Sequence, residues 1–126
     1  MKQHTVTIGG RTFALAFTLD ALCSLQDMID DFDLSKIVDY VKTPKGMLSL
    51  LTAMAEQGEA LEGRILDVDR HWFGSHTSPS PARIAEIQAA LLGTMTDWMM
   101  METDNGQEEV QDAVLQEIKK NGTAAG

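Results

Sequence analysis

Asp67, Asp69, His71 and His76 form the only cluster in the sequence whose residue types suit metal-ion chemistry. Carboxylates and imidazoles are ligands for divalent transition metals. On a strand the first three side chains would share one face, whereas a helix would spread them around its axis. Because this spacing matches no established metal site, we expect an acidic, solvated loop that binds no metal. A small metal-dependent enzyme built on these four residues is the alternative that stays open.

Other catalytic signatures are missing from the sequence. Gly9–Gly10 lacks the further glycines and the lysine of a phosphate-binding loop. The carboxylate pairs Asp30–Asp31 and Glu108–Glu109 are adjacent in sequence, so their side chains do not converge on one substrate. Cys23 is the only cysteine, which excludes an intramolecular disulfide, and no residue near it in sequence would activate its thiol. We therefore expect a protein that is not an enzyme and uses no cofactor.

The run Trp98–Met101 places four large apolar side chains in succession on a predicted helix. At 3.6 residues per turn they sweep about 300° of the helix circumference, so they cannot all face one core. Methionine side chains are soft and adapt to surfaces of varied shape. Met99, Met100 and Met101 therefore either form a patch that binds an apolar partner or a second copy of the chain, or are covered by a C-terminal helix that folds back.

Trp72 and Phe73 are a second candidate for partner binding. They lie in segment 69–80, where glycine, proline and hydroxyl residues gather, as is typical of a loop. We expect both aromatic side chains to anchor this loop in the core. The alternative is an exposed aromatic contact for a protein partner, because a few aromatic residues often dominate binding at such surfaces.

The N-terminal residues, about 3–17, predict a β-hairpin. Val6 and Ile8 alternate with threonines, as on a half-buried strand. Gly9–Gly10 can adopt the positive φ angles of a two-residue hairpin loop. Thr18 is placed to cap the helix that follows. Because an isolated hairpin is only marginally stable in water, this one must pack on helices from later in the chain.

Apolar residues at three- and four-residue spacing predict the remaining elements. Thr43–Pro44 and Ser80–Pro81 each combine a capping side chain with a proline at the first helical position. Gly58 is expected to end the third helix, with at most a turn or two of helix over 61–68. The predicted helices cover about residues 18–30, 34–42, 44–58, 81–102 and 108–119, with a frayed end over 121–126.

These elements predict the fold class and the domain organisation. The chain has 126 residues, of which 44% are hydrophobic, and this is enough to bury a core without a metal or disulfide. We expect a single domain over residues 1–126. Its class is α+β and mostly helical, with an N-terminal two-stranded hairpin packed on about five α-helices.

The charge of the chain limits its partners. The net charge is −9, from nineteen acidic and ten basic residues. This balance disfavours a nucleic-acid backbone or an anionic membrane surface as a partner. No segment approaches the ~20 apolar residues of a membrane span, and the N-terminus has no apolar run of signal-peptide length. We therefore expect a cytoplasmic protein that binds neither nucleic acid nor membranes.

The N-terminal arrangement resembles a known family. A hairpin over Ile8–Leu15, followed by the helix-opening stretch Phe17–Leu22, is similar to the tail assembly chaperones of long-tailed bacteriophages and prophages. The length of the chain and its acidic balance are similar too. The resemblance extends more loosely to about residue 101.

The resemblance implies a non-enzymatic function in the cytoplasm of a bacterial host. Proteins of this family bind the tape measure protein and recruit tail tube subunits around it during tail assembly. These two proteins are thus the implied partners, and the methionines make self-association a further expectation. An acidic surface with methionine patches suits weak, displaceable contacts of this kind. A structural tail or connector subunit that stays in the virion is the alternative.

Overall fold

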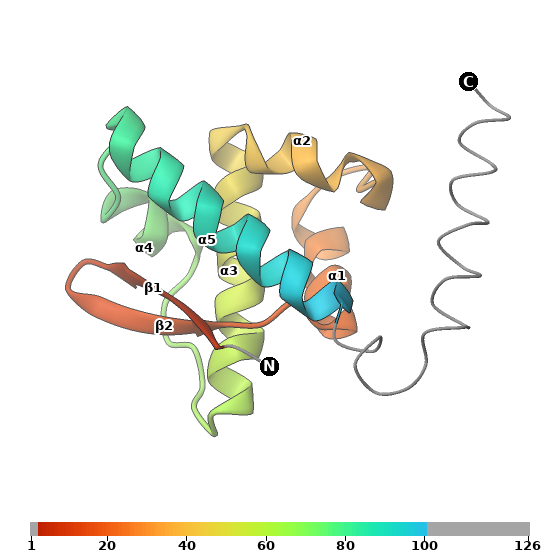
Figure 1. Ribbon diagram of the computed structural model, residues 1–126, viewed down its shortest axis with the longest axis horizontal. Coiled ribbons are helices and arrows are strands. Elements are labelled where there is room, and N and C mark those ends of the chain that lie inside the picture. The colour runs from red at the N-terminus through yellow and green to blue at the C-terminus, as the bar shows by residue number, and fades with distance from the viewer. Residues whose placement is uncertain (1–2, 101–126) are drawn as a thin grey trace, which may run out of the picture.

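The computed structural model describes residues 3–100. The predicted helix over 108–119, the predicted frayed end over 121–126 and Met101 lie outside these residues. A two-stranded hairpin is followed by helices, so the predicted class, α+β and mostly helical, is confirmed (Figure 1). In chain order the elements are β1 (His4–Ile8), β2 (Arg11–Leu15), α1 (Leu19–Met28), the 3₁₀ helix η1 (Leu34–Lys36), α2 (Ile37–Val41), α3 (Pro44–Leu61), α4 (Arg70–Ser75) and α5 (Pro81–Met100).

The hairpin forms as its alternation predicts. β1 and β2 are antiparallel, with Val6 opposite Phe13. Gly9 and Gly10 have φ angles of 58° and 78°, which glycine adopts without the steric cost that a side chain would add. The apolar face turns inward, and Val6, Ile8, Phe13 and Leu15 are all buried.

Three helices begin at the predicted capping residues. The side-chain oxygens of Thr18, Thr43 and Ser80 each accept a hydrogen bond from the backbone amide three residues further on, at 3.2, 3.1 and 3.2 Å. Each bond satisfies one of the amides that a helix N-terminus leaves without an intrahelical partner. These side chains therefore define where α1, α3 and α5 start.

Helix α3 is the centre of the fold. It contacts α1, α2, α4, α5 and β2, and in Figure 1 it runs behind α5 with the hairpin across its lower half. The apolar residues on its inward face are buried, as are those in the middle of α5. The α3 residues are Met47, Leu50, Leu51 and Met54, and the α5 residues are Ile87, Leu91 and Met95.

Polar contacts join α5 to β1. His4 Nε2 lies 2.5 Å from Asp97 Oδ2, and the guanidinium of Arg83 donates to the carbonyl oxygen of Thr7. The hairpin is thus held between two helices, with α3 against β2 and α5 against β1.

Gly58 does not end α3, so this prediction is wrong. The helix continues to Leu61 because Gly58 serves a different purpose: a Cβ at this position would lie 2.1 Å from the carbonyl oxygen of Ala14. Glycine here lets the helix cross β2 in direct contact. The residue that terminates the helix is Gly63 (φ 78°), and the amides of Gly63 and Arg64 donate to carbonyls of the last turn.

Segment 69–80 is not entirely a loop, which corrects a second prediction. Arg70–Ser75 forms the helix α4, because Asp69 caps it through a 2.9 Å hydrogen bond from the amide of Trp72. Six residues are too few to show a helical period in the sequence. The expected turn or two of helix over 61–68 is wrong beyond the end of α3: residues 64–69 have no regular structure, and Ile65 is 92% exposed.

Candidate partner-binding site

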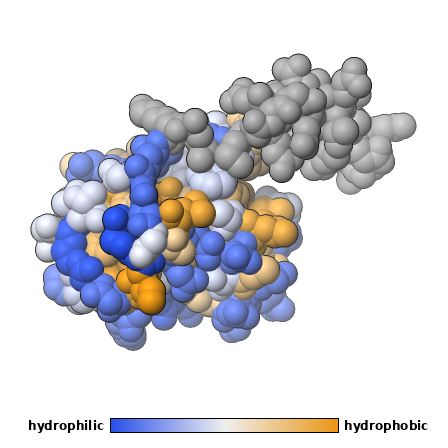
Figure 2. All heavy atoms as spheres, turned by 90° about the horizontal axis from the view of Figure 1, so that it is seen from below, coloured by the Kyte–Doolittle hydropathy of each residue, from blue (hydrophilic) through white to orange (hydrophobic). Residues whose placement is uncertain are grey.

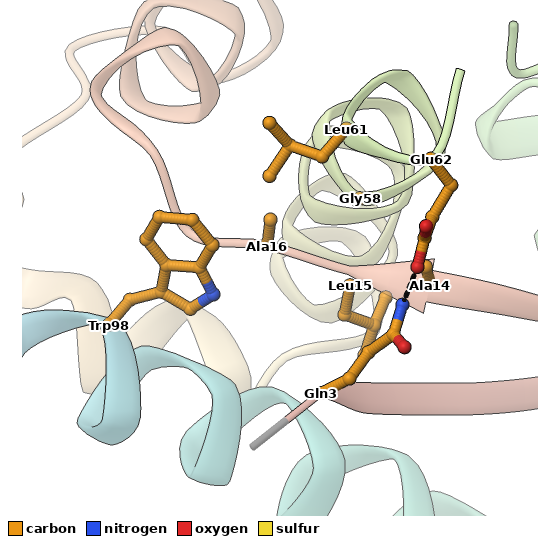
Figure 3. A pocket seen from close by; sticks show the side chains of 8 residues that line it. All are labelled: Gln3, Ala14, Leu15, Ala16, Gly58, Leu61, Glu62 and Trp98. Carbon is orange, nitrogen blue, oxygen red and sulfur yellow. Dashed lines mark hydrogen bonds between the residues drawn. The ribbon is translucent and has the colours of Figure 1, made fainter. Parts of the chain in front are cut away.

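A pocket of about 190 Å³ opens where β2, α3 and the end of α5 meet. Figure 3 shows that the three elements each contribute one wall. We call it the β2–α3–α5 pocket. It is lined by Gln3, Ala14, Leu15, Ala16, Gly58, Leu61, Glu62 and Trp98.

One side of the β2–α3–α5 pocket is apolar. Trp98 and Leu61 flank the small side chain of Ala16, and their own side chains form the two sides of the opening (Figure 3). Leu61 is 62% exposed, so its side chain is accessible to a partner. A concave apolar surface of this size accommodates one or two apolar side chains of a partner.

The other side of the pocket is polar. The amide of Gln3 donates to the carboxylate of Glu62 at the rim (Figure 3). Nearby, Glu59 is buried, with 7% exposure. Its carboxylate accepts hydrogen bonds from the amide of Ala14 at 3.0 Å and from Arg64 Nε and Nη2, both at 2.9 Å.

The carboxylate of Glu59 is stabilised in its charged form. The hydrogen bonds from Arg64 lower the pKa of the Glu59 carboxyl, and this effect exceeds the opposite effect of burial. The amide of Ala14 stabilises the same charged form. An ionised Glu59 therefore connects α3 to the outer edge of β2 and holds the pocket floor in place.

The predicted methionine patch lies at the end of α5, the helix that supplies Trp98 to this pocket. Met99 and Met100 follow Trp98 directly and are 57% and 53% exposed, whereas Met95 is buried. On the face shown in Figure 2, apolar patches are separated by polar residues rather than joined into one surface. Met101 and the segment that could fold back over the patch lie outside the described residues. Within the described part of the chain, two of the three predicted methionines are accessible.

Phe73 belongs to the core and Trp72 packs against it, and neither lines this site. Phe73 has no exposed surface and packs edge-on against Phe13, with ring centroids 5.1 Å apart. Trp72 is half-buried and stacks on His76 at 4.1 Å. The predicted anchoring role is confirmed for Phe73, and the alternative of an exposed contact is wrong for it.

The four candidate metal ligands have separate positions. Asp67 pairs with Arg11 at 2.7 Å, and this hydrogen bond lowers the pKa of Asp67. Asp69 caps α4, His76 lies on Trp72, and His71 is exposed. Among residues 3–100 no three metal-ligating side chains converge. The enzyme alternative therefore has no assembled metal site in this part of the chain.

Sequence reasoning missed the β2–α3–α5 pocket because its walls are far apart in the chain. Leu61 and Trp98 come from different helices, and nothing in their local spacing connects them. The one available signal was Gly58, since a glycine inside an apolar helix indicates close approach of another backbone as well as a helix end.

Two further findings bear on function. Among residues 3–100, no helix combines the length and the apolar character that crossing a membrane would require. No family model, curated protein or solved structure matches this chain.

Proposed function

We propose that the protein is a non-enzymatic tail assembly chaperone of a phage or prophage. It acts in the bacterial cytoplasm, where it binds an apolar segment of the tape measure protein and recruits tail tube subunits. The observation that carries this proposal is the exposure of Met99 and Met100 at the end of α5, the helix that also supplies Trp98 to the β2–α3–α5 pocket. The hairpin and first helix, which resemble that family, support it.

The chemistry of the site suits a client that is later released. The pocket takes an apolar side chain between Trp98 and Leu61, and the neighbouring methionines adapt to whatever sequence follows it. A pocket of about 190 Å³ buries little surface, so each contact is weak and can be displaced when tube subunits arrive. The acidic surface keeps the free chain soluble and steers encounter with a basic partner.

The test compares two substitutions of the same kind. Met100→Lys adds a charge at the patch, and Val38→Lys adds the same charge on α2, where Val38 is 50% exposed. Both variants are mixed with the tape measure protein encoded in the same genome, and binding is measured by calorimetry. We expect Met100→Lys to weaken binding at least about tenfold, or 1.4 kcal/mol, with Val38→Lys unchanged.

Three results would contradict the proposal. The first is equal binding by both variants, and the second is no binding by the unaltered chain. The third is the presence of the chain in purified particles at a fixed stoichiometry, which would favour the structural tail or connector subunit. Mass spectrometry of such particles distinguishes a chaperone, which is absent from the finished particle, from a structural subunit, which is present in it.

A further inference from the structure

A second concave region lies on the α4 side of the molecule, away from the β2–α3–α5 pocket. Two hollows of about 490 and 180 Å³ adjoin there and share Leu48 and Gly74. We call them together the α3–α4 groove. Its cationic end is lined by Lys45, Arg70, His71 and Ser75, and its apolar end by Pro44, Met47, Thr77, Ser78, Pro79 and Ile84.

The cations of this groove have no carboxylate partner in the described chain. Residues 3–100 contain seven lysines and arginines, of which Arg11, Arg64 and Arg83 pair with carboxylates within 4 Å. The other four, Lys36, Lys42, Lys45 and Arg70, form no such pair among these residues, and Lys45 and Arg70 line the groove. In a chain of net charge −9, a cationic hollow next to an apolar one is complementary to an acidic, amphipathic segment.

The chain itself contains such a segment. Residues 102–117 include six acidic residues and no lysine or arginine, and Val110, Val114 and Ile118 recur at helical spacing. We propose that the α3–α4 groove of one copy binds residues 102–118 of a second copy. The acidic side chains would face Lys45 and Arg70, and the apolar ones would lie along Leu48 toward the Pro79 end.

Chain length favours a second copy over the same chain. α5 starts at Pro81, beside the groove, and crosses the molecule to end at Met100 on the opposite side (Figure 1). Its twenty residues span about 30 Å. Only Met101 lies between the end of α5 and segment 102–118, and one residue spans at most about 3.6 Å, which is too short for that segment to begin at the groove of its own chain.

The resulting contact joins different surfaces of the two copies. Each chain would offer its groove to one neighbour and its C-terminal segment to another. Such a contact closes into a ring or a reciprocal dimer where the rotation between copies permits, and otherwise continues as an open chain. This association goes beyond client binding and needs no client, so it can be tested on the purified protein alone.

The experiment uses charge reversal at both sides of the interface in the full chain. The groove variant is Lys45→Glu with Arg70→Glu, and the segment variant is Glu108→Lys with Glu109→Lys. The control, Lys36→Glu with Lys42→Glu, makes the same charge change as the groove variant outside the groove. Sedimentation velocity from micromolar to millimolar concentration reports the size of each, and circular dichroism checks that each is folded.

We expect the unaltered chain and the control to form dimers or larger species as concentration rises. Each interface variant alone should associate at least about tenfold more weakly. An equimolar mixture of the two interface variants should regain association, because the intact groove of one meets the intact segment of the other. Added salt should weaken the association of the unaltered chain, because it screens the charges across the interface. This can be measured without any variant.

Three outcomes would overturn the inference. The first is an unaltered chain that stays monomeric at every concentration, as docking within one chain would produce. The second is a groove variant that associates as strongly as the control. The third is a mixture that forms nothing beyond monomers. None of these depends on the tape measure protein, so failure here is distinct from failure of the proposed chaperone function.

Discussion

At the scale of the residue, Glu59 determines how the central helix and the hairpin stay together. Its carboxylate is buried and accepts three hydrogen bonds, two from Arg64 and one from the backbone of β2. A neutral side chain of the same shape keeps an acceptor for the amide of Ala14 but loses the charge that Arg64 stabilises. Glu59 therefore stabilises the fold by an amount that depends on pH.

We expect Glu59→Gln to lower the free energy of unfolding by about 1–2 kcal/mol at neutral pH, allowing for the solvent exposure of Arg64. Because the pKa of Glu59 is lowered in the folded state, the stabilisation is complete above the unfolded pKa of about 4.5. It is lost as the pH falls from there through the folded pKa. Urea denaturation at several pH values measures this. Glu86→Gln, at an exposed position, is the control, and a Glu59→Gln deficit that persists at low pH would contradict the assignment.

At the scale of the element, the crossing of α3 over β2 depends on one missing side chain. A Cβ at Gly58 would approach backbone atoms of Ala14 and Leu15 at 2.1–2.6 Å, and a backbone cannot rotate out of the way as a side chain can. The helix would have to move off the strand, which would also stretch the 3.0 Å bond from the amide of Ala16 to the carbonyl of Met54.

Gly58→Ala should therefore destabilise the protein by about 1–3 kcal/mol, although alanine favours a helix more than glycine does. Gly93→Ala is the matched comparison in α5. A Cβ there would lie 3.3 Å from the end of the His4 side chain, which can shift by the few tenths of an ångström required. We expect Gly93→Ala to be neutral or slightly stabilising. Thermal unfolding of both variants measures the difference, and equal melting temperatures would disprove the close-approach argument.

Local signals in the sequence were enough to predict most of these elements. The alternation of β1 and β2, the glycine pair between them and the caps at Thr18, Thr43 and Ser80 are all interactions over a few residues. The sequence was misleading where a residue serves a distant neighbour. Gly58 and the six-residue α4 both depend on contacts with the hairpin, and their sequence neighbours do not record those contacts.

The candidate site could be predicted only in part for the same reason. The run of methionines is local, and the exposure of Met99 and Met100 follows from helical geometry. The β2–α3–α5 pocket is not local, because Leu61 and Trp98 meet only once α3 and α5 have packed. The pairing of Asp67 with Arg11 likewise removes a metal ligand that sequence alone left available.

At the scale of the whole molecule, one core connects the hairpin with the helices. Phe73 from α4 packs on Phe13 from β2, and buried residues of α3 and α5 belong to the same cluster. Loss of Phe73 would therefore leave a cavity in the centre of the domain rather than at a periphery. The hairpin and helices should unfold together because neither has a separate core.

We expect Phe73→Ala to cost about 3–5 kcal/mol while retaining a single unfolding transition. Urea denaturation followed by tryptophan fluorescence and by far-ultraviolet circular dichroism should give coincident curves for this variant and for the unaltered chain. Val38→Ala, at an exposed position on α2, should change stability by no more than about 0.5 kcal/mol. Separate midpoints for the two probes would mean that the hairpin and helices are independent units.

The carboxylate of Glu59 and the carbonyl of Met54 have one more consequence. They accept hydrogen bonds from the backbone amides of Ala14 and Ala16, which lie on the side of β2 that faces away from β1. A sheet extends by offering such amides to an incoming strand, and this side has none free at those two positions. Addition of a strand is therefore hindered at this end of the edge, where Glu59 and Met54 take up the hydrogen bonds that an incoming strand would need.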